Sequence, residues 1–175
     1  MNEHVSPGAQ ESVDESLEES LSRLPGEART LAAQGNKAAR YAAESRYGYL
    51  GGLMNMEVIE AEDGKSVLTA EVTPNVLNGY GYVHGGMLFT LADYAMGATA
   101  RTLVEKGSSP VTLEAKITYT SNVREGRLLA LCEALHQTKR LIMLETRITN
   151  ADTKELVAII AGTFYVIREE GENGS

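Results

Sequence analysis

The segment from Met87 to about Leu103 constrains the fold most, because its apolar residues recur with a helical period over a length well beyond that of a strand. At about 100° per residue, one stripe of this segment is expected to face a sheet. The stripe consists of Leu88, Leu91, Ala92, Ala95, Thr99 and Thr102. We expect two strands before this helix and four after it. That order is typical of the α+β class, in which an antiparallel sheet packs on a helix.

The expected strands are bounded by short polar or glycine-containing breaks. They are Met54–Ala61, Lys65–Val72, Val111–Asn122, Arg127–His136, Leu141–Asn150 and Leu156–Ile167. The last of them is apolar on both faces, whereas an antiparallel strand with one solvated face should alternate apolar and polar residues. We therefore expect both faces of this part of the sheet to be covered, one by the helix and the other by a neighbouring subunit or an N-terminal helix.

A length of 175 residues favours a single domain with a proper core. The 16 basic and 24 acidic residues give a formal charge of −8, which argues against nucleic-acid binding but leaves room for a few local cations that hold an anionic ligand. The one cysteine, Cys132, excludes an intramolecular disulfide. It lies in an apolar run, so we expect a buried and inert thiol.

Composition divides the chain into four parts. Residues 1–24 read as a mobile acidic tail, 25–46 as a helical extension, 47–168 as the main domain and 169–175 as a C-terminal tail. The N-terminus lacks the basic start and apolar stretch of a signal peptide. The longest apolar run is too short to span a bilayer as a helix. We therefore expect a soluble, cytoplasmic protein that does not bind membranes.

The helix face opposite the apolar stripe lacks the charges of a solvated face. It holds Gly86, Phe89, Thr90, Asp93, Gly97 and Ala100. Glycine inside a helix costs roughly 1 kcal/mol relative to alanine, so Gly97 indicates that something packs closely there. A second copy of the helix, related by a two-fold axis, would fit this face.

Asp93 is a lone carboxylate on this small and apolar face. Burying an unpaired charge is expensive. Asp93 must therefore have a structural partner, lie in a wet pocket or take part in chemistry.

His84, Gly85 and Gly86 precede the helix and place two glycines at its start. Backbone N–H groups are unpaired there and the helix dipole is positive, which suits an oxyanion or a carbonyl oxygen, although glycines also simply start helices. Together with Asp93 these residues supply the parts needed for acyl transfer: a backbone donor and a carboxylate. The two lie roughly 10 Å apart along one helix, so the carboxylate would have to come from a paired subunit.

The stretch from Asn78 to Gly86, NGYGYVHGG, followed by Leu91-Ala92-Asp93, resembles the hotdog-fold thioesterases of the phenylacetic acid degradation (PaaI) type. The resemblance continues in later strands and covers roughly 47–167. Its further parts are Val111–Glu114, Ile117–Tyr119, Leu156–Ala158 and Gly162–Phe164. The resemblance implies an antiparallel sheet wrapped around one long central helix.

The resemblance also implies roles for single residues. The N–H of Gly85 would bind the thioester carbonyl oxygen, and Asp93 of the opposite subunit would act as general base or as nucleophile. Asn78 would position the water or the thioester, His84 would border the site, and Thr112 would assist the attacking water. As alternatives, Asn78 shapes only its loop, His84 only braces the helix start, and Thr112 is an ordinary strand residue.

Coenzyme A requires cations for its phosphates. Lys139 and Arg140 lie in a turn where the family often has a glycine followed by an arginine, and Arg124 is a third candidate. Thr138 departs from that glycine, which puts the geometry of the turn in question. Surface charge without a function is the alternative for all three cations.

The expected function is that of an acyl-CoA thioesterase acting on an aromatic or medium-chain acyl group. We expect no cofactor beyond the coenzyme A of the substrate, and no metal, because three histidines and one cysteine form no ligand cluster. A non-catalytic acyl-CoA sensor and a hotdog hydratase or dehydratase are the alternatives. The expected assembly is at least a homodimer, and the doubly apolar strands favour a tetramer.

Overall fold

The computed structural model of the chain describes residues 48–168. The predictions for residues 1–24, 25–46 and 169–175 lie outside this range. The elements in chain order are α3 (Gly48–Leu53), β1 (Met56–Glu62), β2 (Lys65–Glu71), the 3-10 helix η1 (Pro74–Val76), α4 (Gly85–Thr102), β3 (Ser108–Tyr119), β4 (Arg127–Gln137), β5 (Leu141–Asn150) and β6 (Leu156–Arg168).

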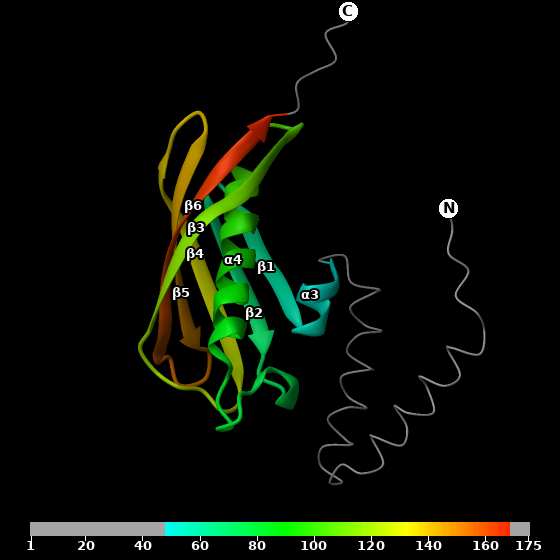
Figure 1. Cartoon of the computed structure of the whole chain (residues 1–175), viewed down its shortest axis with the longest axis vertical. Coiled ribbons are helices and arrows are strands. Elements are labelled where there is room, and N and C mark those ends of the chain that lie inside the picture. Colours follow the sequence, from blue (N-terminus) through cyan, green and yellow to red (C-terminus); the bar gives the residue numbers. More distant parts are fainter. Residues whose placement is uncertain (1–47, 169–175) are drawn as a thin grey trace, which may run out of the picture.

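The six strands form one antiparallel sheet in the order β1-β2-β4-β5-β6-β3. The sheet curls around α4, which contacts all six strands (Figure 1). This arrangement confirms the predicted α+β class and the hotdog fold. Strands β1 and β3 are the two edges of the sheet, so their outer backbone groups have no partner strand among residues 48–168.

The six predicted strands and the predicted helix of the main domain are present, with shifted ends. Helix α4 begins at Gly85, two residues before the expected start. Strand β1 begins at Met56 because the short helix α3, which the sequence did not reveal, precedes it and ends in a turn with Asn55 at a φ of 49°. Helix η1 lies in the connection between β2 and α4.

The apolar stripe of α4 is buried as expected from Leu88 to Thr99. The assignment of Ala100 to the opposite face was wrong, because its side chain is fully buried. The physical reason is the curl of the sheet, which surrounds more of the helix than a flat layer would. Met96 is buried as well, and it lies so close to β6 that a Cβ on Gly162 would come within 2.9 Å of its Sδ.

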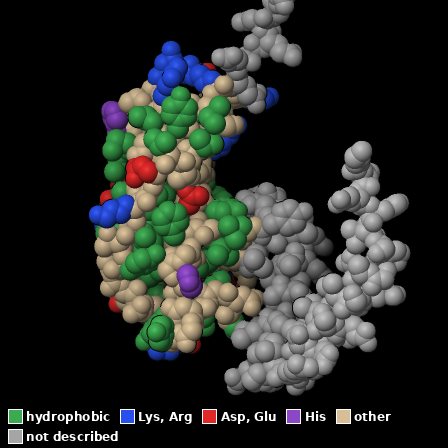
Figure 2. All heavy atoms as spheres, in the orientation of Figure 1, with side chains coloured by type: hydrophobic (Ala, Val, Ile, Leu, Met, Phe, Trp, Pro, Cys, Tyr) green, Lys and Arg blue, Asp and Glu red, His purple; other side chains and the backbone are tan. Residues whose placement is uncertain are grey.

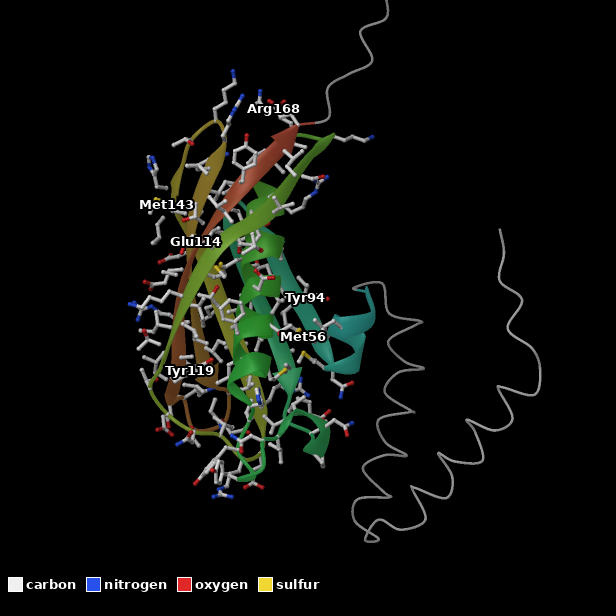
Figure 3. The ribbon with its side chains drawn as sticks, viewed as in Figure 1. Met56, Tyr94, Glu114, Tyr119, Met143 and Arg168 are labelled. Atoms are coloured by element: carbon white, nitrogen blue, oxygen red, sulfur yellow. The ribbon has the colours of Figure 1, made fainter. Side chains whose placement is uncertain are left out.

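The sheet face away from α4 exposes apolar side chains on β4, β5 and β6. They are Leu131, Leu135, Leu141, Met143 and Ile167. Met143 lies on the side of the sheet turned away from the helix (Figure 3). Coverage of this face by a neighbouring subunit stays a prediction.

Cys132 is buried, as predicted, and burial raises the pKa of its thiol. Because the charged thiolate is disfavoured, this thiol is not a reactive nucleophile at neutral pH. Among residues 48–168, no helix is long and apolar enough to cross a membrane.

Candidate active site

Asp93 lies on the third turn of α4 and is half-buried. Thr112 of β3 donates a hydrogen bond from its Oγ1 to Oδ1 of Asp93, at 2.7 Å. Within the described residues Thr112 is the only recorded side-chain partner of this carboxylate. Because the second oxygen, Oδ2, has no such partner, the carboxylate is oriented and still able to accept a proton.

A β-bulge in β3 determines which of its side chains reach α4. Thr112 pairs with Phe164, but Glu114 pairs with the neighbouring Thr163, so Leu113 is an extra residue in the ladder. Side chains alternate between the faces of a strand, and residues 112 and 119 would lie on opposite faces of a regular strand. The extra residue shifts this alternation, and both Thr112 and Tyr119 contact α4.

His84 is the N-cap residue of α4. Its Nδ1 accepts a hydrogen bond from the N–H of Gly86 at 2.9 Å, and its carbonyl oxygen accepts from the N–H of Met87. The side chain therefore braces the helix start. This contact is the one that the structural interpretation of His84 predicts.

The N–H of Gly85 has no recorded hydrogen-bond partner in the described part of the chain. Of the two glycine amides at this helix start, only that of Gly86 is occupied by the cap. Gly85 therefore offers a free N–H at the positive end of the helix dipole. This geometry is the one required of a donor to a carbonyl oxygen.

Asn78 shapes the loop before the helix. Its Oδ1 accepts hydrogen bonds from the N–H groups of Tyr80 and Tyr82, at 2.9 and 3.2 Å. Its own N–H donates to the carbonyl oxygen of Tyr82 at 2.7 Å. The side-chain oxygen is thus used by the loop, which supports the structural interpretation of this residue.

The predicted site residues form two groups within one chain. Asp93 and Thr112 make the first group, and His84 and Gly85 at the helix start make the second. Eight residues of helix separate Gly85 from Asp93, or about 12 Å at 1.5 Å per residue. A single chain therefore does not bring the backbone donor and the carboxylate to one carbonyl carbon.

Tyr119 belongs to the second group, although the sequence analysis assigned it no role. Its hydroxyl donates to the carbonyl oxygen of Gly85 at 3.1 Å. It lies at the end of β3, near the first turns of α4 (Figure 3). Its place in the family-like stretch Ile117–Tyr119 was the available signal.

The three candidate cations lie at opposite ends of α4. The guanidinium of Arg124 stacks over the Tyr82 ring at 3.9 Å and lies 3.5 Å from the carbonyl oxygen of Tyr80, near the helix start. Lys139 and Arg140 lie in the turn between β4 and β5, beside the helix end. Lys and Arg side chains gather at this end of the molecule (Figure 2).

The turn that holds Lys139 and Arg140 does not require a glycine. The hydroxyl of Thr138 accepts from the N–H groups of Arg140 and Leu141, at 3.3 and 3.0 Å, and Thr138 has an ordinary negative φ. Its departure from the family pattern therefore keeps a well-formed turn. Arg140 also donates to the hydroxyl of Tyr165 at 3.4 Å.

A hollow of about 660 Å³ lies elsewhere, over β1, β2, β4 and β5. Five of its eleven lining residues are acidic, and none of the eleven is a predicted site residue. An ion pair between Glu145 and Arg147 crosses part of it. In the described residues no group of three or more His, Cys, Asp or Glu side chains is arranged to hold a metal ion.

Comparison with known proteins points to one family. Residues 80–157 match the Thioesterase superfamily. The 1,4-dihydroxy-2-naphthoyl-CoA hydrolase of Listeria monocytogenes is 31% identical over 113 residues, which cover 65% of this chain and 91% of the relative. The acyl-coenzyme A thioesterase PaaI of Escherichia coli is 30% identical over 115 residues, which cover 65% of this chain and 79% of the relative.

A solved structure has the same fold and a related sequence. The hypothetical thioesterase protein of Streptococcus pneumoniae, solved with coenzyme A, is 32% identical, with a TM-score of 0.61 over 66% of this chain and 88% of that one. Variants of that protein with one aspartate or one threonine replaced by alanine have also been solved.

Proposed function

We propose a specific reaction for this chain, which belongs to the thioesterase superfamily and is a thioester hydrolase. It hydrolyses acyl-CoA, with an aromatic or medium-chain acyl group, at a site to which two subunits contribute. The observation that carries this proposal is the pair of incomplete groups in one chain: a free N–H at Gly85 and an oriented, accessible carboxylate at Asp93, about 12 Å away along the helix.

A two-fold axis at the level of Phe89 completes the site. Phe89 is midway between Gly85 and Asp93, so two antiparallel α4 helices related by this axis would bring Asp93 of the partner subunit to the level of Gly85. The same axis would bring Thr112 of the partner subunit towards Tyr119, because these residues accompany Asp93 and Gly85 along β3. The same two-fold axis would therefore pair both the α4 helices and the β3 strands of the two subunits.

The edge strand β3 supports this pairing. It is 12 residues long, and Val111, Leu113 and Tyr119 have exposed fractions of 40%, 61% and 51%. A long edge with unpaired backbone groups and exposed apolar side chains is a template for pairing with another chain. We infer that β3 pairs with β3 of a second subunit.

The reaction is a hydrolysis in which water replaces the thiol of coenzyme A. The N–H of Gly85 binds the thioester oxygen and stabilises the negative charge that develops there. Asp93 of the partner subunit accepts a proton from water, the water oxygen attacks the carbonyl carbon, and the C–S bond breaks. The proton passes to the departing thiolate. Attack by Asp93 itself, through an anhydride that water then cleaves, is the alternative course.

Thr112 orients the carboxylate for this step. Its hydroxyl occupies Oδ1 of Asp93, and Oδ2 is left for the water. Asn78 and His84 act on the site indirectly, since one holds the loop and the other the helix start. An aspartate and a threonine are also the residue types replaced in the Streptococcus pneumoniae variants.

The two-fold axis also predicts where the candidate cations would lie relative to the substrate. The C-cap residue that follows the partner's α4, Leu103 of the partner subunit, would lie about 15 Å beyond the level of Gly85 at 1.5 Å per residue. Lys139 and Arg140 of the partner subunit lie beside that end, while Arg124 lies near the helix start of the first chain. This offset suits coenzyme A, in which the extended pantetheine arm separates the sulfur from the phosphates.

Two apolar surfaces support the proposed acyl group and the proposed assembly. Phe89 and Gly97 on the open face of α4 would line the space between the two helices, which suits an aromatic or medium-chain group. The exposed apolar side chains of β4, β5 and β6 would bury against a second dimer, giving a homotetramer.

Release of free thiol from a panel of aromatic, short, medium and long acyl-CoAs tests this proposal. Replacement of Asp93 by Asn or Ala should lower kcat by roughly 10²- to 10⁴-fold, because the carboxylate that takes the proton is lost. Asp63→Asn, in the turn between β1 and β2, is the matched control and should keep full activity. Unchanged turnover in both Asp93 variants, or tight binding of acyl-CoA without any thiol release by the unaltered protein, would contradict the proposal.

A further inference from the structure

Tyr119 touches the backbone of the residue that carries the free N–H. It is the last residue of β3, about half exposed, and its hydroxyl donates to the carbonyl oxygen of Gly85. Gly85 belongs to two peptide groups. The first carries the N–H that points out of the helix start, and the second carries the carbonyl oxygen that accepts from Tyr119. A contact that fixes one of these peptide groups therefore restricts the other.

The side chain of Tyr119 fills the space in which a Cβ on Gly85 would lie. A Cβ built there would come 2.8 Å from the Tyr119 oxygen and 3.0 Å from its Cζ. Real Cβ atoms do not approach other heavy atoms so closely, so any larger residue at this position would displace the ring or the helix start. A side chain at position 85 would therefore meet Tyr119 of the same chain as well as an approaching substrate.

Glycine also needs such a neighbour if its N–H is to point in one direction. Without a Cβ its backbone has more conformational freedom than that of any other residue. The cap formed by His84 holds the next amide, that of Gly86, and leaves the N–H of Gly85 without a partner. The carbonyl oxygen of His84, in the same peptide group as this N–H, accepts from the N–H of Met87 at 2.9 Å, and the ring of Tyr119 adds a restraint from the other side of Gly85.

We propose that Tyr119 is a positioning residue, which holds the Gly85 amide in the direction that the thioester oxygen requires and forms one wall of the space in front of it. The inference rests on the proposed function and deepens it. Tyr119 has this place only because the bulge at Leu113 turns it to the same side of β3 as Thr112. The edge strand β3 therefore positions both the carboxylate of Asp93 and the backbone donor of Gly85.

A double-mutant cycle between positions 85 and 119 tests this inference. Gly85→Ala keeps the N–H, but its added methyl group enters the space of the Tyr119 ring and displaces the helix start, so kcat should fall by up to roughly 10²- to 10³-fold, the usual cost when one such donor no longer meets the oxygen. Tyr119→Ala should lower kcat about tenfold with little change in KM, because an amide that is no longer held still binds the oxygen part of the time. The double variant Gly85→Ala/Tyr119→Ala should be at least about tenfold more active than Gly85→Ala, since the added methyl group then has room.

Tyr119→Phe separates the two contacts of the side chain. It keeps the ring and loses the hydroxyl, so we expect kcat within about threefold of the unaltered enzyme, the effect of one exposed neutral hydrogen bond. Gly79→Ala is the matched glycine control, because nothing lies within 4 Å of a Cβ at that position. It should leave both activity and stability unchanged.

The thermal midpoint Tm provides a readout that does not depend on catalysis. Gly85→Ala should lower Tm relative to Gly79→Ala, and Tyr119→Ala should restore part of the loss in the double variant. A double variant no more active than Gly85→Ala, or a Tyr119→Ala variant with full kcat, would overturn the inference. If the unaltered protein hydrolysed no acyl-CoA but the Tm cycle showed this rescue, the proposed function would fail while the contact between Tyr119 and Gly85 stood.

Discussion

The two edge strands of the sheet have the same local irregularity and differ in what it achieves. Each carries one bulge around an exposed apolar residue, Ile59 in β1 and Leu113 in β3. Strand β1 is short, has three glutamates among its seven residues, and is contacted by α3. Charge and short length protect an edge from pairing.

Strand β3 has little of this protection. It is 12 residues long, and its bulge turns Thr112 and Tyr119 to the helix, where they contact Asp93 and Gly85. Strand β1 therefore only ends the sheet, whereas β3 contacts both groups of the candidate site. The open edge and the half-formed site occur on the same strand because, in our account, pairing of that strand completes the site.

The largest difference between the two edge strands is expected when the same substitution, an apolar residue to glutamate, is made in each of them. Leu113→Glu is expected to break the β3–β3 interface, so that the assembly separates there, and to lower activity at least about 100-fold, because a charge enters an apolar interface twice by symmetry. The folded single chain should change by no more than about 0.5 kcal/mol, since this side chain is exposed. Ile59→Glu on β1 should leave assembly and activity unchanged.

Light scattering together with thiol release measures both effects of this pair of variants. A Leu113→Glu protein that keeps its assembly and full activity would show that β3 is not the edge that pairs. An Ile59→Glu protein that loses its assembly would assign the interface to β1.

A smaller effect is expected from a matched pair of threonines on β3. Thr112→Val removes the hydrogen bond to Asp93, and loss of a bond to a charged group should lower kcat roughly 10- to 100-fold. Thr118→Val is the control, because the side chain of Thr118 is exposed and has no recorded partner among the described residues. Steady-state kinetics of both variants give the measurement. Equal kcat values would reduce Thr112 to an ordinary strand residue.

The sequence predicted the elements well because their apolar periods are strong. The order of strands and helix followed from the period of α4 and from the turns between the strands, and the later comparisons confirm the family that the stretch from Asn78 to Gly86 indicated. The error at Ala100 arose because a helical wheel treats the sheet as flat. Helix α3 was missed because its glycine-rich sequence, GYLGGL, has little helical propensity of its own.

The sequence named the residues of the candidate site but did not give their contacts. Asp93, Gly85 and Thr112 were named from the sequence, but the bulge at Leu113 has no marker such as a glycine and follows only from how β3 and β6 pair. Tyr119 could not be assigned a role without that bulge, because a regular strand would turn it away from Thr112. Which amide of the two glycines stays free also depends on the cap geometry of His84.

Subunit complementation tests directly whether each active site combines Gly85 of one subunit with Asp93 of the other. Two inactive variants, Asp93→Asn and Gly85→Ala, would be co-expressed with different tags and the mixed dimer purified through both. One of its two sites would combine an intact Gly85 with an intact Asp93 of the partner subunit, so we predict about half of the thiol-release activity of the unaltered dimer. A mixed dimer as inactive as either parent would contradict the account, because a site contained in one chain cannot be repaired by a second one.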